Sequence, residues 1–478
     1  MAKFNTKITP KKPDTKTYEN APAYSREPVQ AWLNMLFSSF LENQYYESSK
    51  SQIQRFIELT EKVAEKYGYA FVGKAAIFAR NELGMRSISQ LTAAWLNDKS
   101  FQEKRNFYRG FMRRPDDVSE VFGAVDFLEG KRSHALIRGC ADYLSSLGEY
   151  QIAKYKMTGR TYNMYDIVNL THAHSAAINK LKADTLKAPD TWEVNISTAK
   201  SQESRDIEWK RMVEQNKLGY MALIRNLNNI LAIQDIDRDW IIKYLVPQIK
   251  DEQKIRKSLI FPYRLFTAYK NLKIRSGIVI QALEEAFLIA TSNVPKFDGL
   301  SAVILDVSGS MCSRVSENSI IELKEIGACF AATLILNGSN VDFIKFGTYA
   351  KRRKFLKLEG AFSIIKEMCK NEDLGLGTNI RPVMETMENH YYDRIFLISD
   401  MQVFDNNFMW NQRITLGWND RYQNIMTYSF DLGNYSNQIE PPSDNFMFLT
   451  SMSDVFFKYI SLVESNENIV DIINNIKF

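Results

Sequence analysis

Asp306, Ser308 and Ser310 place one carboxylate and two hydroxyls within a five-residue segment, directly after a short apolar run. Carboxylate and hydroxyl oxygens suit hard divalent cations such as Mg²⁺. Two more oxygen donors follow: Thr378, in a segment that we expect to open a helix, and Asp400, at the end of a second apolar run. Together these residues predict a metal site. The alternative is a polar capped loop in an ordinary α/β sheet, because loops are rich in Asp, Ser and Gly.

The order of these donors resembles the metal-ion-dependent adhesion site of von Willebrand factor A-like domains, whose pattern is DxSxS, then Thr, then Asp. Asp306, Ser308, Ser310, Thr378 and Asp400 fill all five positions. The resemblance implies a bound divalent cation, with Mg²⁺ as the first choice and Mn²⁺ or Ca²⁺ as alternatives. The hydroxyls would bind it directly and the aspartates partly through water. It also implies an open coordination position that takes a carboxylate from a protein ligand.

Alternating strands and helices would position these donors. The sequence predicts strands at 301–305, 340–346, 393–399 and 424–430, and helices near 319–335 and 452–464. Such alternation with buried strands is typical of a parallel, doubly wound, Rossmann-like α/β sheet. Ligands of these sheets bind at the carboxyl ends of strands, where Asp306 and Asp400 both fall. We therefore expect residues 299–478 to form the A-like domain.

The stretch before this domain has a different character. At 478 residues the chain is too long for one compact core. Residues 26–295 carry amphipathic helical periodicity, for example at 29–37, 53–59 and 69–78, with turn signals between the segments. Helices in pairs predict an α-helical repeat or solenoid. Residues 1–25 are rich in Lys, Pro and Thr and predict a flexible arm or an extended strap.

Charge divides the chain at about the same point. The net charge is +5, but residues 301–478 hold 16 Lys and Arg against 22 Asp and Glu, or −6, which leaves +11 for residues 1–300. This imbalance predicts a basic domain for a polyanion joined to a near-neutral or acidic module. The alternative is a chance imbalance on two solvated surfaces.

Composition also bears on the compartment. The four cysteines show no CxxC or other paired spacing, which is typical of free thiols in a reducing compartment rather than of disulfides or zinc ligands. No apolar run reaches the roughly 18 to 20 residues that span a bilayer. The first residues lack the apolar core of a signal peptide. These features predict a cytoplasmic location and no membrane partner.

Basic and aromatic residues alternate in parts of the helical stretch. Arg113 lies in a segment of arginines, Phe and Tyr, Arg138 follows a second basic pair, and Lys154 and Arg160 flank a Tyr-containing segment. Arg and Lys neutralise phosphates, and Tyr and Phe rings can stack on unpaired bases. These four residues are candidate RNA contacts. The alternative is a set of solvated helix faces beside core aromatics.

Four longer motifs resemble hallmarks of the TROVE-domain proteins, the Ro autoantigen family. They are the segments 154–172, 189–194, 218–227 and 261–269. The A-like metal domain that follows is the expected companion, in the same order, so the resemblance covers nearly the whole chain. It implies a ring of HEAT-like α-helical repeats closed by the A-like domain.

The resemblance also implies the ligands. The outer basic face would hold small structured RNAs of the Y RNA type, and the central hole would hold single-stranded 3′ ends of misfolded RNAs. In the family a Lys, an Arg and a His contact Y RNA; the Lys maps onto Lys154 and the His onto His172. The Arg position falls on Thr158, so Arg160, two residues further on, is the candidate substitute. His172 with His174 lacks a third metal ligand nearby, which leaves packing or capping as the alternative to an RNA role.

Three classes of function remain. The leading hypothesis is a monomeric, ring-shaped ribonucleoprotein component that scaffolds a small noncoding RNA and presents aberrant RNA to an exoribonuclease for RNA quality control. The second is a metal-dependent protein-interaction module that captures a partner carboxylate. The third is a metal-dependent nuclease, which would need a general base or a paired-metal carboxylate cluster that the sequence lacks. We therefore expect a binding protein and no enzyme.

Overall fold

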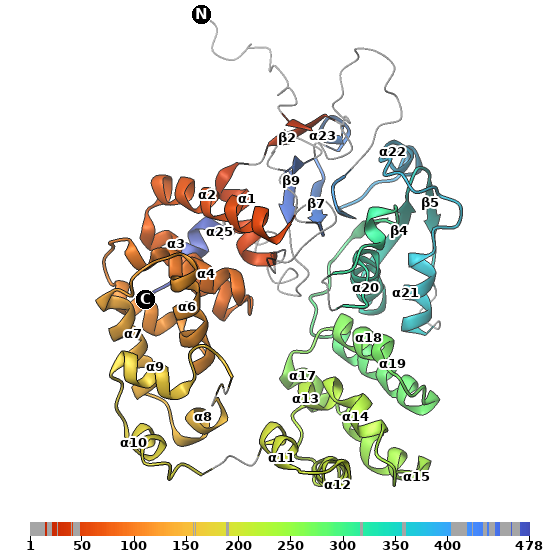
Figure 1. Cartoon of the computed structure of the whole chain (residues 1–478). Coiled ribbons are helices and arrows are strands. Elements are labelled where there is room, and N and C mark those ends of the chain that lie inside the picture. The colour runs from red at the N-terminus through yellow and green to blue at the C-terminus, as the bar shows by residue number, and fades with distance from the viewer. Residues whose placement is uncertain are drawn as a thin grey trace, which may run out of the picture. The chain divides into compact units, whose positions relative to one another are not determined.

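The computed structural model describes residues 15–16, 22–25, 27–39, 41, 48–155, 157, 159–187, 191–315, 319–355, 360–402, 418–422, 424–433, 437–438, 445–449, 460 and 469–478. The chain divides into two compact units (Figure 1). The sheet unit comprises Met1–Asn34, Glu42–Ser48 and Lys296–Met452, and the helical unit comprises Met35–Leu41, Ser49–Pro295 and Ser453–Phe478. Helix α1 (Pro28–Ser38) begins in the sheet unit and ends in the helical unit. None of the described helices is long and apolar enough to cross a membrane.

A six-stranded sheet forms the centre of the sheet unit, with the strand order β5-β4-β3-β6-β7-β9. Its strands are β3 (Leu300–Asp306), β4 (Asn340–Phe346), β5 (Ala350–Arg353), β6 (Arg394–Ser399), β7 (Met426–Asp431) and β9 (Phe446–Leu449). All neighbours are parallel except the antiparallel pair β4–β5. The chain places β4 on one side of β3 and then β6 on the other. This reversal creates a topological switch point between β3 and β6, as in doubly wound α/β folds.

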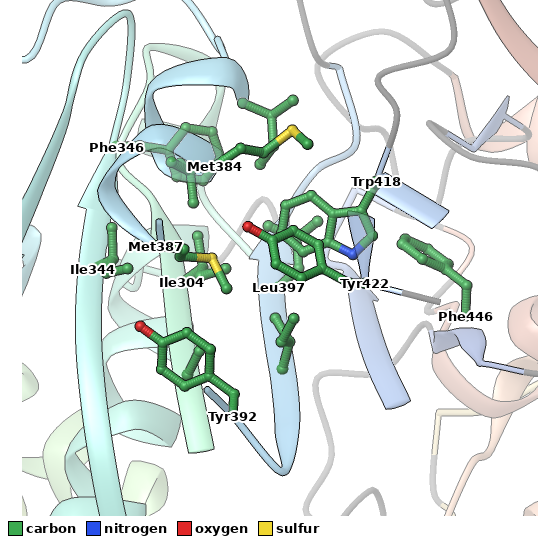
Figure 2. Close-up of a cluster of buried hydrophobic side chains, with 14 of the residues drawn as sticks. Ile304, Ile344, Phe346, Met384, Met387, Tyr392, Leu397, Trp418, Tyr422 and Phe446 are labelled. Atoms are coloured by element: carbon green, nitrogen blue, oxygen red, sulfur yellow. The ribbon is translucent and has the colours of Figure 1, made fainter. Parts of the chain in front are cut away.

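Helices cover both faces of the sheet. They are α20 (Leu323–Leu336), α21 (Ala361–Cys369), α22 (Arg381–Thr386) and α23 (Trp418–Arg421). Because side chains alternate along a strand, Ile304 and Leu397 face one side, where they pack with Met384 of α22 and Trp418 of α23 (Figure 2). On the other side α20 approaches so closely that a Cβ added to Gly327 would lie 2.5 Å from the Leu305 side chain. The predicted α/β fold is thereby confirmed.

The described part of the N-terminal arm is extended. Strand β1 (Thr15–Lys16) pairs with β2 (Pro22–Ser25), which pairs in turn with β8 (Asn437–Gln438), and both pairs are antiparallel. The flexible arm and the extended strap predicted for residues 1–25 both stay predictions, because only residues 15–16 and 22–25 of that range are described. The backbone hydrogen bonds of these strands explain why this segment belongs to the sheet unit.

Short helices make up the helical unit. They are α2 (Ser49–Tyr67), α3 (Tyr69–Asn81), α4 (Ser87–Trp95), α5 (Lys104–Phe111), α6 (Pro115–Phe127), α7 (His134–Ser145), α8 (Glu149–Lys154), α9 (Met164–Thr171), α10 (Ala176–Lys182), α11 (Trp192–Thr198), α12 (Gln202–Glu214), α13 (Tyr220–Arg225), α14 (Leu227–Leu231), α15 (Arg238–Trp240), α16 (Val246–Ile249), α17 (Glu252–Ser258), α18 (Pro262–Asn271), α19 (Gly277–Thr291) and α25 (Ile469–Asn474). Helices α18 and α19 lie side by side (Figure 1).

Alternate helices of this unit stack on one another. Helix α5 packs on α3, α7 on α5 and α9 on α7, while α4 packs on α6. Such neighbour-to-neighbour stacking is the arrangement of helical repeat proteins, in which each repeat buries its apolar face against the next. The predicted α-helical repeat is confirmed in these contacts.

The end of the described chain differs from the predicted domain 299–478. Helix α25 packs on α3, and Lys74 Nζ donates a hydrogen bond to the carbonyl of Asn474 at 2.5 Å. The Phe478 ring lies 5.8 Å from the ring of Phe107 and 5.9 Å from that of Phe101. This aromatic packing joins the segment to the helical unit. The helix predicted near 452–464 lies outside the described residues, apart from Ile460.

Candidate functional site

The predicted metal ligands gather at the carboxyl edge of the sheet. Asp306 ends β3, and Asp400 directly follows β6, the parallel neighbour of β3. Both aspartates therefore lie at the switch point, where doubly wound sheets bind their ligands. The side chains of Asp306 and Asp400 are 0% and 1% exposed.

Asp306 is held by two donors. Its Oδ1 accepts a hydrogen bond from the Ser308 backbone N–H at 2.8 Å, and its Oδ2 accepts one from Ser399 Oγ at 2.6 Å. Burial raises the pKa of the Asp306 carboxyl to about 6, although these hydrogen bonds favour the ionised form and oppose the shift. The hydrogen bonds therefore hold the carboxylate in position, but they do not offset the cost of burying its negative charge.

The buried Asp400 carboxylate accepts fewer short hydrogen bonds than Asp306 does. Its Oδ1 accepts a hydrogen bond from the Gln402 backbone N–H at 3.3 Å, whereas its buried Oδ2 has no partner among the described residues. Burial, together with the nearby Asp306 charge, raises the pKa of Asp400 to about 7. A buried polar atom without a partner costs free energy. A cation beside Oδ2 would remove that cost and the repulsion between the two aspartates.

The hydroxyl donors lie on two loops that touch. Ser308 Oγ and Ser310 Oγ are 3.4 Å apart. The Gly309 N–H donates to the Leu376 carbonyl at 3.0 Å, which brings the loop of Thr378 beside the DxSxS segment. Thr378 is buried. It does not open a helix as predicted, because α22 begins three residues later at Arg381.

Ser399 and Thr348 contribute to the geometry although the sequence analysis did not select them. Ser399 bonds to Asp306, and Thr348 Oγ1 accepts from the Gly377 N–H at 3.2 Å. A Cβ added to Gly375 would lie 2.4 Å from Thr348 Oγ1, so the close approach of the loops requires glycine there. Ser399 could have been found because it directly precedes Asp400 at the end of a strand. Thr348 has no comparable sequence signal.

The donor set determines which chemistry is available. In the described ranges no cluster of three or more His, Cys, Asp or Glu side chains could hold a metal ion. Two carboxylates with Ser and Thr hydroxyls are a different kind of set, one that fits a hard cation such as Mg²⁺ better than zinc. The orphaned Oδ2 of Asp400 supports that fit.

Two predicted RNA contacts, Lys154 and Arg160, line the same surface hollow of the helical unit. The hollow has a volume of about 350 Å³, and Arg86, Arg114 and Tyr155 also line it. The Arg114 guanidinium lies 5.2 Å and Lys154 Nζ 5.9 Å from the centre of the Tyr155 ring, so two cations lie close to one aromatic ring. This is an anion-attracting surface with an aromatic wall.

Acidic residues partly neutralise these cations. Asp116 pairs with Arg86 at 2.6 Å and with Arg114 at 3.1 Å. Arg160 and Lys154 each lie 3.8 Å from a glutamate oxygen, which is a loose surface contact. One carboxylate is therefore shared by two guanidinium groups, and an excess of positive charge remains.

The other three predicted RNA contacts are exposed but are not among the residues that line this hollow. Arg113 directly precedes Arg114, Arg138 lies on α7, and His172 follows α9. His172 has φ 55°, and its backbone N–H donates to the Asn169 carbonyl, so it caps the helix. The capping role predicted as an alternative is therefore present.

Arg86 was missed from the sequence. It precedes α4, far from Lys154 along the chain, and it lies outside every motif that carried the resemblance. Arg114 was visible as part of a basic pair, but nothing local distinguished it from Arg113. Asp117 fixes the backbone of both residues: it is buried, and it accepts hydrogen bonds from the backbone N–H groups of Arg113 and Arg114 and from the Arg80 side chain. Only the tertiary structure shows that Arg114, and not Arg113, lines the hollow.

Comparisons with known proteins match both the sequence and the fold. Residues 155–277 match the TROVE domain model. The RNA-binding protein RO60 of Caenorhabditis elegans is 27% identical over 188 residues, which are 37% of this chain and 29% of that protein. The matched region thus spans less than a third of the relative's length.

A solved structure has a similar fold. The crystal structure of the Deinococcus radiodurans Ro (Rsr) protein aligns with a TM-score of 0.65 and 14% sequence identity, covering 92% of this chain and 100% of that one. Its helical and sheet parts correspond to those described above. Residues 155–277, which lie inside the helical unit, thus match the TROVE domain, and the chain has a fold similar to that of the Deinococcus radiodurans Ro structure.

Proposed function

We propose that this protein binds RNA through the basic surface of its helical unit. One observation carries the proposal: Lys154, which directly precedes the TROVE match, and Arg160, which lies inside it, share a hollow with Arg86 and Arg114. Guanidinium and ammonium groups neutralise phosphates, and an aromatic wall offers a stacking face. The excess charge of +11 in residues 1–300 supports the same assignment.

The finer proposal concerns which RNA is bound and for what purpose. The resemblance to Ro proteins supports a small structured noncoding RNA of the Y type on the basic surface, with single-stranded 3′ ends of misfolded RNA as a second ligand. An exoribonuclease would then be the partner that degrades the presented RNA in quality control. The role is binding and presentation rather than catalysis, in a cytoplasmic setting.

Purification from the native host followed by sequencing of bound RNA tests this function. We expect one discrete small structured RNA. The double variant Lys154→Ala/Arg160→Ala should lose most of it, whereas Lys182→Ala/Arg205→Ala, which removes two exposed cations elsewhere in the same unit, should retain it. Protein free of nucleic acid, or equal recovery from both double variants, would contradict the proposal.

A second candidate function follows from the sheet unit. We propose that Asp306, Ser308, Ser310, Thr378 and Asp400 hold Mg²⁺ or a similar cation. The orphaned Asp400 Oδ2 supports this proposal. When bound, the cation would offer an open position to a carboxylate of a partner protein. The chain's own residues fix the donor positions, and four of them, Asp306, Ser308, Thr378 and Asp400, are buried.

Calorimetric titration with Mg²⁺ and Mn²⁺ tests the cation site. Asp400→Asn should abolish the binding heat because it replaces the orphaned carboxylate oxygen with a neutral group. Asp373→Asn, which neutralises an exposed carboxylate in the same unit, should leave it unchanged. RNA affinity should be the same in both variants. Full cation binding by the Asp400→Asn protein would refute the site.

A further inference from the structure

Two apolar side chains stand beside the candidate cation site of the sheet unit. Leu376 is 73% exposed and Tyr349 is 64% exposed. Apolar side chains scattered singly over a surface are normal, so exposure alone does not mark a binding site. The position of these two is informative, because Tyr349 follows β4 and Leu376 precedes Thr378, on the loops at the carboxyl edge of the sheet. We call Leu376 and Tyr349 the apolar rim.

Leu376 borders the loop that carries the two serine donors. Its carbonyl accepts a hydrogen bond from the Gly309 N–H at 3.0 Å, and its Cβ lies 3.8 Å from a Cβ built on Gly309. Gly309 separates Ser308 from Ser310. A group that approaches these hydroxyls therefore comes within reach of the Leu376 side chain.

Backbone contacts hold Tyr349 against the same loop. The Tyr349 N–H donates to the Leu374 carbonyl at 2.8 Å, and the Tyr349 carbonyl accepts from the Gly347 N–H at 2.9 Å. A Cβ added to Gly347 would clash with the Gly375 carbonyl oxygen, so the two loops touch backbone to backbone. The apolar rim thus stands on an ordered backbone, which reduces the entropy that a partner must overcome when it binds there.

The charges near the site favour one carboxylate over a polyanion. Arg381 is exposed three residues after Thr378, and its backbone N–H donates to Asn379 Oδ1 at 3.1 Å. A guanidinium and a divalent cation both attract a carboxylate. Residues 301–478 carry −6 in total, which repels a polyanion such as RNA, whereas a single carboxylate meets mainly the local positive charge.

We propose that the cation site and the apolar rim together bind a protein segment in which an Asp or Glu carboxylate stands beside a large apolar side chain. The inference rests on the cation site proposed above and adds the chemistry of its partner. The carboxylate takes the open coordination position, and the apolar side chain packs on Leu376 and Tyr349. Leu376 has no ring on which a base could stack, so the rim fits an apolar side chain better than RNA.

Selection from a random peptide library tests the inference on the full chain. The protein is immobilised in the presence of Mg²⁺, and the bound peptides are eluted with EDTA and sequenced. We expect enrichment of peptides that carry Asp or Glu beside Leu, Ile, Phe or Trp. A fluorescein-labelled copy of the most enriched peptide then serves as the probe for anisotropy. Replacing its acidic residue by the corresponding amide should abolish binding.

Variants of the chain locate the effect. Leu376→Ser should weaken binding of the labelled peptide by about tenfold to a hundredfold, the range expected for losing the burial of one leucine side chain. Leu376→Met should keep most of the affinity because it retains an apolar side chain of similar size. Both variants should bind Mg²⁺ as the wild type does, because Leu376 supplies no side-chain donor. Tyr391→Ser removes a ring that is 92% exposed before β6, at the opposite edge of the sheet, and should change neither affinity.

The outcomes separate the inference from the proposed cation site. If calorimetry shows Mg²⁺ binding but no peptide is eluted by EDTA, the cation site stands and the inference is overturned. The same holds if the enriched peptides lack an apolar residue and Leu376→Ser binds them as the wild type does. If Mg²⁺ does not bind, both fall together. RNA affinity that falls in both Asp400→Asn and Leu376→Ser would assign this face to RNA instead of a protein.

Discussion

In the sheet unit, the buried ammonium group of Lys345 holds neighbouring segments in place. Its side chain is fully buried, and its Nζ donates to the carbonyls of Glu367 at 3.0 Å and Lys370 at 2.8 Å. Glu372 lies 3.4 Å from the same Nζ and also pairs with Lys351 and Arg353. A buried ammonium is tolerated when its donors are satisfied in this way. The cluster anchors the segment after α21 to the edge of the sheet.

The charge of Glu372 predicts a pH-dependent stability. Hydrogen bonds from Lys351 and Arg353, with the charge of Lys345, lower the pKa of Glu372 from 4.5 to about 2. Because the folded pKa is lower than the unfolded one, this stabilisation is fully present above about pH 4.5 and is lost as the pH falls toward 2. Glu372→Gln should therefore lower the free energy of unfolding at pH 7 by about 1–3 kcal/mol.

Urea denaturation of both proteins at pH 7 and at pH 3 measures this effect. The difference in the free energy of unfolding between the wild type and Glu372→Gln should be smaller at pH 3 than at pH 7. Glu388→Gln breaks only the exposed contact with Arg421 at 2.9 Å, and its cost should stay below about 1 kcal/mol at both values. A gap that does not change with pH would contradict the proposed role of the charge.

At the scale of elements, close helix packing holds the repeat stack together. Helices α5 and α7 cross at Gly139, where an added Cβ would lie 2.6 Å from both the Arg105 carbonyl oxygen and Tyr108 Cβ. One of these atoms belongs to the backbone, and Tyr108 is fully buried, so neither can give way easily. The contact therefore requires glycine because a side chain would separate the helices.

Gly139→Ala should consequently destabilise the helical unit by about 1–3 kcal/mol, the usual cost of overpacking. Gly123→Ala on α6 is the matched control, since nothing lies within 4 Å of its added Cβ. The free energy of unfolding of the Gly123→Ala protein should rise by about 0.5–1 kcal/mol because alanine has a higher helix propensity than glycine. Thermal unfolding followed by circular dichroism at 222 nm measures both, and equal shifts in the two variants would refute the close-packing argument.

At the scale of the whole molecule, the chain leaves the helical unit to form the sheet unit and then returns. The return is made by α25 and by Phe478, whose ring also lies 3.3 Å from a Cβ built on Gly73. Phe478→Ala should reduce the stability of the helical unit by about 1–2 kcal/mol, because the half-buried ring loses its apolar contacts.

Hydrogen exchange at α3 and α5 provides the measurement for Phe478→Ala. Exchange there should accelerate, whereas the sheet strands should exchange as in the wild type. Lys477→Ala removes an exposed neighbour and serves as the control. Unchanged protection of α3 in the Phe478→Ala protein would show that the ring does not stabilise this unit.

The uneven charge of the chain predicts how salt acts on RNA binding. The basic surface lies in residues 1–300 with +11, and residues 301–478 carry −6. Each phosphate contact releases counterions, so log K for RNA should fall linearly with log salt concentration. Lys154→Ala should reduce that slope by about 0.7–0.9, and Lys351→Ala in the sheet unit should not change it. Fluorescence anisotropy between 50 and 200 mM salt measures both, and a flat dependence would refute phosphate-dominated binding.

Much of the fold was predictable because its signals are local. The buried strand before Asp306 is a continuous apolar run, and the structure places β3 at Leu300–Asp306. The helical periodicity of residues 29–37 becomes α1, with one residue added at each end. Helix and strand periods arise from the backbone itself, so neighbouring residues are enough to reveal them. The metal donors were equally visible because strand ends and short loops are set by the same local pattern.

Contacts between distant segments needed the tertiary structure. Only the parallel pairing of β3 with β6 places Asp400 beside Asp306 and leaves its Oδ2 without a partner. Helix α4 packs on α6, and Arg86 and Lys154 line the same hollow. The Phe478 ring packs on the helical unit beside Gly73, where there is no side chain in its way. Sequence alone determined which residue types can bind a cation or a phosphate. Packing decided which of them meet, because burial and close approach depend on residues that the chain order keeps apart.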